Sequence, residues 1–495
     1  MHSRYIMAID QGTTGTTVSL MDLTGSLVAS ADEDFKQIFP KPGWVEHDPE
    51  DIWGTVAKLI PQVLMKAQVQ GRQVAGIGIT NQRETVVVWD ARNHRPVMNA
   101  VVWQCRRTHD ICAKLKKAGH ERLFKKKTGL VLDPYFSGTK IHWILKNVPS
   151  CREILGRGDL RAGTIDSFLI WRLSKGESHV TDVSNASRTL LMDLASTDWD
   201  PQLLKILGVP REMLPTITDS SGILGFTKGL GVLPDGIPIA GVAGDQQSAL
   251  FGQTCWQAGE SKCTYGTGSF LLMNTGAKIV ASKSGLLTTV AWRLPKQKTQ
   301  YALEGGAFVC GAAVQWLRDG LGIIKGSGEI EALAREVATA DGVEFVPALT
   351  GLGAPYWKPE ARGVITGLTR GTGRAHIARA TLEAMALQNC EILIAMQKDL
   401  GKKLKSLKVD GGASANNLLM QMQADYMGTT VVRPRSIETT SMGAAYLAGL
   451  GVGFWKSLED IKKVWQKDQS FAPDMTAKAR KQRLEHWQAA VRRSF

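Results

Sequence analysis

Asp245, Gln246 and Gln247 place a carboxylate and two amides side by side near the middle of the sequence. The apolar run Ile237–Ala240 before them indicates the end of a strand, and the residues after Gln246 favour a helix. A carboxylate at such a strand-to-helix turn can face a cleft and accept a proton from a substrate alcohol. A simpler role for the aspartate is to cap the following helix, and on this segment alone capping is the commoner role.

Two turns rich in glycine and threonine could bind phosphate. The first spans Asp10–Thr17 between apolar runs at 6–9 and 18–22, and the second spans Tyr265–Phe270. The tip of such a hairpin offers backbone N–H groups and hydroxyls, and Asp10 could hold a magnesium ion through water. Each could equally be a hairpin without a ligand. Their repetition indicates two related halves that face each other across a cleft.

Arg83 and Glu84 follow a predicted buried strand, Gly76–Thr80, and could together bind the hydroxyls of a small polyol. The alternative for this pair is a surface ion pair. Trp103 ends another predicted strand and brings an aromatic ring to the same edge. Tyr135 could add its hydroxyl, although a tyrosine of the core is the usual interpretation.

Two segments of the second half are suited to a nucleotide. Leu303–Leu317 is predicted to be a glycine-rich turn that runs into a helix, and Asp410–Asn417 continues a strand through Asp-Gly-Gly toward a helix start with two asparagines. Glycines let a base and a sugar approach the backbone, and asparagine amides can bond to them. The segments Ala162–Trp171 and Thr181–Thr189 are expected to be scaffold and loop without chemistry.

The 495 residues exceed what one hydrophobic core usually serves, so two large domains are expected. We expect a cytoplasmic protein without membrane insertion, because no apolar run has membrane-spanning length. The seven scattered cysteines fit reduced structural thiols better than disulfides or zinc ligands. The net charge of +14 is assigned to solvated surfaces rather than nucleic-acid binding, because the lysine clusters at 125–127 and 402–408 lack interleaved aromatic residues.

Together these segments resemble the FGGY family of carbohydrate kinases, within the superfamily of actin, hexokinase and the heat-shock ATPases. The resemblance covers residues 5 to 455, and it includes two family signatures, at Tyr135–Asn147 and Gly363–Glu383. Further strings are most similar to those of the family members that phosphorylate glycerol: GWVEHDP at 43–49, NQRET at 81–85, WQCRRT at 103–108, DPYFSGTK at 133–140 and GDQQ at 244–247.

The resemblance implies an α/β fold with two ribonuclease-H-like (actin-like ATPase) domains and a catalytic cleft between them. The expected division is an N-terminal glycerol-binding domain at 1–254, a C-terminal nucleotide-binding domain at 255–455 and a C-terminal helical extension at 456–495. ATP would lie between the domains, glycerol deep in the cleft, and the chain would form dimers or tetramers. The implied reaction, in glycerol catabolism, is the transfer of the γ-phosphate of ATP to glycerol.

The resemblance also assigns roles to residues. Asp245 would take the proton from the attacking hydroxyl. Glycerol would be bound by Arg83, Glu84, Trp103, Tyr135, Asp245, Gln246 and Phe270. The nucleotide and its phosphates would be bound by Thr13, Thr14, Gly15, Thr267, Gly311, Gln315, Gly412 and Asn416. Mg²⁺ would lie near Asp10 and Asp245.

The sequence departs from its family at Thr17, where many glycerol-phosphorylating members have an arginine that reaches toward the ATP phosphates. That difference puts the affinity for the nucleotide in question. Two alternatives stay open: a kinase for another polyol or ketose, which would need a remodelled pocket around Arg83, Glu84 and Trp103, and a catalytically silent nucleotide-binding switch.

Regulation by fructose 1,6-bisphosphate is predicted to be absent. Enteric family members bind this inhibitor through an arginine-bearing loop, whereas the corresponding segment Leu233–Gly236 has no arginine. Control through a phosphorylated histidine is likewise predicted to be absent, because no histidine lies between Gly222 and Gly241. Phosphorylation rates measured with and without the sugar bisphosphate should agree; a rate that falls as it is added contradicts the prediction.

Overall fold

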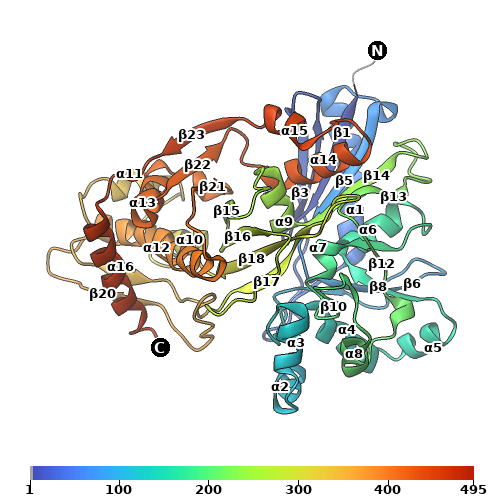
Figure 1. The fold of residues 1–495 in the computed structure, drawn as a ribbon, viewed down its shortest axis with the longest axis horizontal. Coiled ribbons are helices and arrows are strands. Elements are labelled where there is room, and N and C mark those ends of the chain that lie inside the picture. The colour runs from blue at the N-terminus through green and yellow to red at the C-terminus, as the bar shows by residue number, and fades with distance from the viewer. Residues whose placement is uncertain (1–3) are drawn as a thin grey trace.

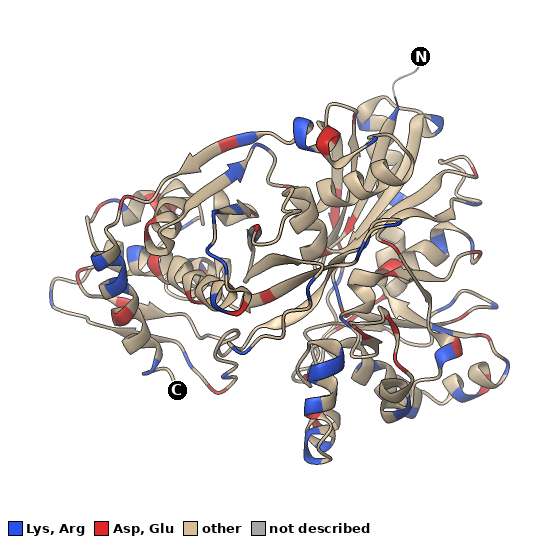
Figure 2. Ribbon diagram, in the orientation of Figure 1, with Lys and Arg blue, Asp and Glu red and all other residues tan. Residues whose placement is uncertain are grey.

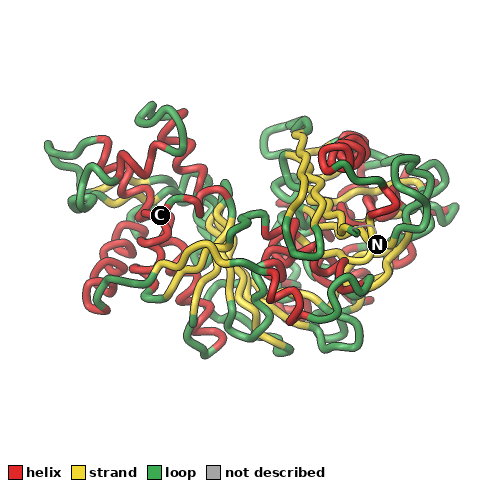
Figure 3. Tube along the Cα trace, turned by 90° about the horizontal axis from the view of Figure 1, so that it is seen from above, coloured by secondary structure: helices red, strands yellow, loops and turns green. Residues whose placement is uncertain are grey.

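The protein is built on two large mixed sheets, which the computed structural model describes over residues 4–495 (Figure 1). The predicted first domain begins at residue 1, so its first three residues lie outside the described range. Seen from above, in Figure 3, each sheet forms the centre of one domain, with helices around it. We call the domain around the six-stranded sheet the first domain and that around the seven-stranded sheet the second domain.

The first sheet has the strand order β13-β14-β5-β1-β2-β3. β1, β2 and β3 are antiparallel neighbours, while β5 and β14 run parallel to β1. The neighbouring parallel strands β1, β5 and β14 are buried over most of their length, as parallel strands covered by helices require. Their bounds are β1 Tyr5–Gln11, β2 Gly15–Met21, β3 Leu27–Asp34, β5 Val74–Asn81, β13 Ser221–Phe226 and β14 Pro238–Gly244.

The second sheet repeats this pattern in the order β17-β18-β16-β15-β21-β22-β23. β15, β16 and β18 are antiparallel neighbours, and β21 and β22 run parallel to β15. The prediction of two ribonuclease-H-like halves is therefore confirmed. The bounds are β15 Ser261–Tyr265, β16 Ser269–Gly276, β17 Leu287–Trp292, β18 Gln300–Ala307, β21 Ser406–Asp410, β22 Thr430–Pro434 and β23 Lys467–Phe471.

Smaller sheets and most of the short helices belong to an insertion between β5 and β14. Its four-stranded sheet, ordered β4-β7-β6-β8, combines β6, β7 and β8, which follow β5, with β4, which precedes β5 in the chain. The short strands are β4 Glu46–His47, β6 Val86–Asp90, β7 Ala100–Val101, β8 Leu160–Thr164, β9 Val180–Asp182, β10 Met192–Asp193, β11 Asp198–Trp199, β12 Thr216–Thr218 and, in the second domain, β19 Glu344–Val346 and β20 Val364–Thr366.

Helices of the first domain cover its sheet and build the insertion. They are α1 Pro49–Ala67, α2 His109–Lys117, α3 Glu121–Thr128, α4 Ser137–Asn147, α5 Ser150–Gly156, α6 Ile165–Leu173, α7 Val183–Ala186, α8 Pro201–Leu207 and α9 Asp245–Gly252, with the 3₁₀ turns η1 Gly71–Gln73 and η2 Arg211–Met213. The longest of them, α1, starts with Asp48 as a side-chain cap and Pro49 in its first turn.

The remaining helices follow in the second half of the chain. They are α10 Gly311–Asp319, α11 Glu329–Ala334, α12 Arg374–Leu400, α13 Asn417–Met427, α14 Thr439–Gly451, α15 Leu458–Val464 and α16 Ala477–Val491, with the 3₁₀ turn η3 Gly412–Ala415. The buried helix α12 confirms the predicted long helix at 375–399. The prediction of a helical extension over 456–495 misses one strand, because β23 pairs with β22 at the edge of the second sheet.

Two helices join the domains. α9 follows the last parallel strand of the first sheet and contacts β15 and β16 of the second, while α14 follows β22 of the second sheet and packs on β1, β5 and β14 of the first. The far end of the β17–β18 hairpin also packs into the first domain, where Val290 and Tyr301 belong to the core of the insertion. The boundary between the domains is therefore a packed interface, built from both halves of the chain.

Charged groups are spread over both domains. Figure 2 shows Lys and Arg interspersed with Asp and Glu on most of the helices, with a concentration of basic residues on α2 and α3.

All seven cysteines are buried and free, which confirms the prediction of unpaired structural thiols. Among the residues described, 4–495, no helix is long and apolar enough to cross a bilayer.

The close packing of α14 on the first sheet predicts the effect of a mutation. A Cβ atom at Gly78 of β5 would lie 2.1 Å from the carbonyl oxygen of Ala444, so the helix backbone has to move to admit Gly78→Ala. We expect this substitution to lower the free energy of unfolding by about 2 kcal/mol or more, measured by denaturant titration. The control is Gly54→Ala on the exposed side of α1, where nothing lies within 4 Å, and it should leave stability unchanged or slightly raised. Equal effects of the two substitutions would contradict the packing argument.

Candidate active site

Asp245 is the first residue of α9, directly after β14, as the sequence predicts. One of its carboxylate oxygens accepts from the backbone N–H of Gln246 at 2.6 Å and lies 3.0 Å from Nε of Arg83. The Asp245 side chain is 29% exposed, whereas that of Arg83 is 2% exposed. The acid is therefore more than a helix cap: an arginine holds it while part of it stays open to a ligand.

The close approach of Arg83 to the strand end depends on glycine. A Cβ atom at Gly244 would lie 2.7 Å from Cδ and Cγ of Arg83. The next residue along from the arginine, Glu84, has a φ of 62°, in the left-handed region that a non-glycine residue seldom adopts. Strained backbone of this kind is concentrated at functional sites, where the surrounding structure holds it in place.

Arg83 and Glu84 belong to a buried ion network with two partners that the sequence did not predict. Arg83 donates to Glu304 with Nη1 at 2.5 Å and Nη2 at 3.1 Å. Arg188 donates to Glu84 through Nε at 2.6 Å and to Glu304 through Nη2 at 2.9 Å. All four side chains are at most 3% exposed, so their charges are balanced inside the protein rather than by water.

The charge state of Glu304 follows from this arrangement. Burial alone would favour its neutral form, but the guanidinium groups of Arg188 and Arg83 hold the pKa of the Glu304 carboxyl below its ordinary value. Glu304 is therefore ionised at neutral pH and binds both arginines as an anion.

Aromatic residues close the same site. The rings of Trp103 and Tyr135 are 5.5 Å apart in an edge-to-face arrangement, and Trp103 Nε1 donates to the hydroxyl of Thr13 at 3.0 Å. Burial raises the pKa of Tyr135 far above its usual range, so the phenol stays protonated and can donate. Phe270 pairs across the second sheet with Gly306, which puts its ring on the same face as Glu304 two residues away.

Gln246 is buried next to a lysine that belongs to none of the predicted sites. Lys262, on β15 and fully buried, donates to the side chains of Gln246 and Thr264. Burial lowers the pKa of Lys262, while Asp410 and Asp245 favour its charged form. The amide of Gln246 is thus fixed in orientation beside the acid.

The first hairpin confirms the predicted strand-turn-strand. β1 and β2 pair from Ile6–Met21 to Gln11–Thr16, and their turn holds Thr13 and Thr14. Asp10 lies at the end of β1, where burial together with the charges of Asp245 and Glu438 raises its pKa to about 7. Ser441 Oγ donates to Asp10 at 3.3 Å. This end of β1 is consequently rich in negative charge.

The second hairpin is also confirmed, and it contacts the helix that follows β18. The backbone N–H groups of Cys310 and Ala312 donate to the carbonyl of Thr267, at 2.8 and 3.0 Å, and that of Gly311 donates to Gly266 at 3.0 Å. A Cβ atom at Gly311 would lie 2.7 Å from that Gly266 oxygen, so glycine is needed for the approach. Thr267 and Gly311 are therefore neighbours, as a shared phosphate site requires.

The other predicted nucleotide residues lie on elements around this hairpin. Gln315 is exposed on α10, and Gly412 is exposed in η3 after β21. Asn416 caps α13, accepting from the backbone N–H of Leu419 at 2.9 Å. Gly411, with a φ of 82°, approaches the backbone of Tyr265 so closely that a Cβ atom would lie 2.6 Å from its oxygen. Nucleotide contacts by Gln315, Gly412 and Asn416 stay a prediction.

Two residues of the ion network, Glu304 and Arg188, lie in segments for which the sequence predicts other roles. Leu303–Leu317 was expected to be a turn running into a helix, but its first five residues, 303–307, complete strand β18, which places Glu304 in the interior of the second sheet. Arg188 lies in Thr181–Thr189, which was expected to carry no chemistry. One feature of the sequence could have indicated the role of Glu304: it is the single acidic residue in the apolar run 301–307. A charge buried in such a run needs a partner of opposite charge.

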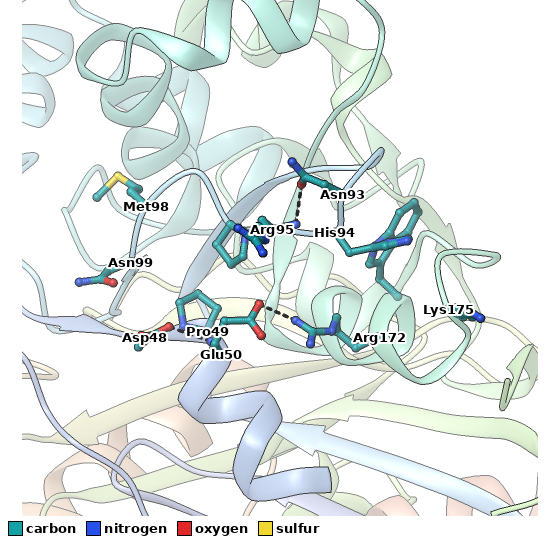
Figure 4. A pocket seen from close by; sticks show the side chains of 12 residues that line it. Asp48, Pro49, Glu50, Asn93, His94, Arg95, Met98, Asn99, Arg172 and Lys175 are labelled. Carbon is teal, nitrogen blue, oxygen red and sulfur yellow. Dashed lines mark hydrogen bonds and ion pairs between the residues drawn. The ribbon is translucent and has the colours of Figure 1, made fainter. Parts of the chain in front are cut away.

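A separate cavity of about 690 Å³ lies on the first domain, away from these residues (Figure 4). It is lined by the start of α1, by the loop between β6 and β7 and by the end of α6, with the ion pair of Glu50 and Arg172 between them. It contains none of the predicted site residues. The candidate site is therefore identified by the chemistry of its residues and not by the volume of this cavity.

Comparison with known proteins agrees with this geometry. The model of the FGGY carbohydrate kinase N-terminal domain matches residues 5–252, and that of the C-terminal domain matches residues 261–452. A protein of Bdellovibrio bacteriovorus named glycerol kinase is 63% identical, over 99% of both chains. Another from Burkholderia ambifaria, with the same name, is 53% identical over 99% of this chain and 98% of its own.

A solved structure is similar throughout. The glycerol kinase of Plasmodium falciparum, crystallised with ADP, matches with a TM-score of 0.93 and 38% identity, over 100% of this chain and 98% of the other. Two domains of matching topology that meet beside a partly exposed acid define a protein of the actin-like ATPase fold class. More narrowly, the chain belongs to the FGGY family of carbohydrate kinases.

Proposed function

We propose that this protein transfers the γ-phosphate of ATP to glycerol, giving sn-glycerol 3-phosphate and ADP. The observation that carries the proposal is the contact between Arg83 and Asp245, beside Glu84 and Tyr135. The names of the full-length relatives and the ADP in a similar solved structure support the same substrates.

The acceptor would be bound by groups that complement three adjacent hydroxyls. Arg83 and Tyr135 donate, and the carboxylates of Glu84 and Asp245 accept, so each hydroxyl can both give and receive a hydrogen bond. Trp103 and Phe270 would pack on the carbon backbone, and Gln246 would lie beside it. A small polyol fits this combination of buried charges and rings, because its alternating donors and acceptors satisfy groups that burial otherwise leaves unpaired.

In the transfer step, the hydroxyl held by Asp245 attacks the γ-phosphorus. A bond forms between that oxygen and phosphorus as the bond from phosphorus to the bridging oxygen of ADP breaks, and the hydroxyl proton passes to the Asp245 carboxylate. Phosphoryl transfer depends chiefly on in-line positioning and on neutralising charge. Thr13, Thr14 and Gly15 on one side and Thr267 and Gly311 on the other would hold the phosphates. Gln315, Gly412 and Asn416 would line the nucleotide.

A magnesium ion fits the end of β1. Burial, and after it the negative charges of Asp245 and Glu438, raise the pKa of Asp10 to about 7, and a divalent cation would favour the ionised carboxylate. Asp10 and Asp245 would hold the ion, partly through water. When bound with ATP, it would neutralise charge on the phosphates.

The organisation of the chain is part of the proposal. We divide it at 1–254, 255–455 and 456–495, supported by family models that match 5–252 and 261–452. A cytoplasmic location is supported by seven buried, free cysteines. A dimer or tetramer is proposed on the resemblance alone.

Replacing the proposed base tests the mechanism. Asp245→Asn should lower kcat by about 100-fold or more, because general-base catalysis contributes this much, while calorimetry should still detect glycerol binding. The measurement is a coupled assay of ADP release with magnesium, ATP and glycerol, repeated with xylulose, gluconate and other polyols. The control is Asp48→Asn, where asparagine also caps α1. Full turnover by the Asp245 variant would remove this residue from the mechanism, and an unmodified protein that prefers another acceptor would refute glycerol.

Thr17 offers a test of the nucleotide site. Thr17 pairs with Asp10 across the first hairpin, so its side chain lies on the same face as this proposed magnesium residue. Thr17→Arg should lower the KM for ATP by about fivefold through a charge-assisted hydrogen bond. Thr17→Gln, which is long but uncharged, serves as the control. An unchanged KM for ATP, or an equal effect of glutamine, would show that residue 17 does not reach the phosphates.

A further inference from the structure

Glu304 reaches the proposed acceptor site from the other domain. It lies on β18 of the second sheet, whereas Arg83 and Glu84 follow β5 of the first and Arg188 follows α7 of the insertion. In Figure 1, β18 runs from the second domain toward α9 and α7 at the domain boundary. Together with Asp245 these four residues form one continuous network of five side chains, from Asp245 through Arg83, Glu304 and Arg188 to Glu84.

Glu304 fixes the orientation of Arg83. Its two oxygens accept from Nη1 and Nη2, at 2.5 and 3.1 Å, while Nε of the same guanidinium faces Asp245. A planar guanidinium with both edges engaged has no freedom to rotate. The face that Arg83 presents to an acceptor hydroxyl is therefore set by a carboxylate of the second domain.

Arg188 fixes the orientation of Glu84. Its Nε donates to Oε1 of Glu84 at 2.6 Å, its Nη2 donates to Glu304 at 2.9 Å, and its guanidinium lies 5.7 Å from the ring centre of Tyr135. The second oxygen of Glu84 makes no hydrogen bond to the residues described, which leaves it for a hydroxyl. Arg188 Nη1, also buried, has no hydrogen-bond partner among those residues.

We propose that Glu304 and Arg188 are positioning residues for the acceptor: they orient Arg83 and Glu84, so that the glycerol-binding groups are in place only when the second domain supplies its carboxylate. The inference rests on the proposed function and adds to it two residues and a dependence of acceptor binding on the other domain. Neither residue needs to touch the substrate.

The energetics favour a positioning role over a purely stabilising one. Taking ions out of water is costly, and well-packed apolar side chains usually give equal or greater stability than a buried ion pair. The four buried members of the network, Arg83, Arg188, Glu84 and Glu304, balance two cations against two anions. Loss of any one of these four leaves an uncompensated charge beside the acceptor. Such a charge would rotate Arg83 or Glu84 toward a new partner.

The test compares two buried glutamates of the second domain. Glu304→Gln keeps the shape of the side chain and removes its charge; the matched control is Glu391→Gln, which loses a buried carboxylate bonded to Tyr356 and Trp487 on the far side of the sheet. We expect Glu304→Gln to raise the KM for glycerol at least tenfold while the KM for ATP stays within twofold. Glu391→Gln should leave both constants within twofold. Glu304→Asp, which keeps the charge, should recover part of the loss.

A second variant checks the network itself. Arg188→Gln should raise the KM for glycerol to a similar extent, and the double variant with Glu304→Gln, in which charge balance is restored, should lose less than the product of the single effects. The melting temperature of each variant is compared with that of the unmodified protein, and a large fall identifies a variant whose structure is disturbed as a whole. A glycerol KM within twofold of the unmodified protein for Glu304→Gln overturns the proposal, as does an equal rise in both KM values. If Glu304→Gln does not fold, Arg188→Lys is judged by the same criterion.

The acceptor preference of the unmodified protein separates the hypothesis on the substrate from the hypothesis on the positioning role. If it phosphorylates another polyol and not glycerol, the proposed substrate fails, and the same variants are then measured with that acceptor. If it phosphorylates glycerol and the variants behave like the control, the function stands and the positioning role fails.

Discussion

The structure depends on one buried guanidinium that binds carboxylates from both domains. Arg83 faces Asp245 of the first domain through Nε and Glu304 of the second through Nη1 and Nη2. Because an arginine with 2% exposure is not solvated by water, its charge is balanced by these two acids. The relative placement of the domains and the geometry of the proposed acceptor site are thus set by the same contacts.

The repeated topology explains how these contacts arise. Each sheet has antiparallel strands, β1 to β3 in the first and β15 to β18 in the second, followed by parallel ones. Each therefore has one Gly/Thr hairpin and acids at strand ends, Asp10 and Asp245 in the first domain and Asp410 in the second. The helices α9 and α14, which follow the parallel strands, each pack on the opposite domain and bring the two strand ends together. Gly78 and Gly443 permit this, because any side chain at either position would overlap the backbone of the facing helix.

Much of this could be predicted from the sequence, because it depends on local pattern. The hairpins at 10–17 and 265–270, the strand-to-helix turn at Asp245 and the long helix near 375–399 follow from apolar runs, glycines and helical spacing. The residues carried by motif strings, such as Arg83 and Glu84, could be assigned in the same way. Glu304 and Arg188 could not, since their role comes from partners 221 and 104 positions away along the chain. Strand β23 was missed because its exposed, charged residues resemble a surface helix, and only pairing with β22 makes them a strand.

The central claim is that Asp245, held by Arg83, directs one acceptor hydroxyl at the end of a triphosphate. A crystal structure with glycerol, magnesium and a non-hydrolysable ATP analogue tests it most directly. We expect an Asp245 carboxylate oxygen about 2.6–3.2 Å from a glycerol hydroxyl, with that hydroxyl in line with the bond from the γ-phosphorus to its leaving group. Glycerol bound elsewhere, or an Asp245 carboxylate beyond hydrogen-bonding distance of every glycerol hydroxyl, would contradict it.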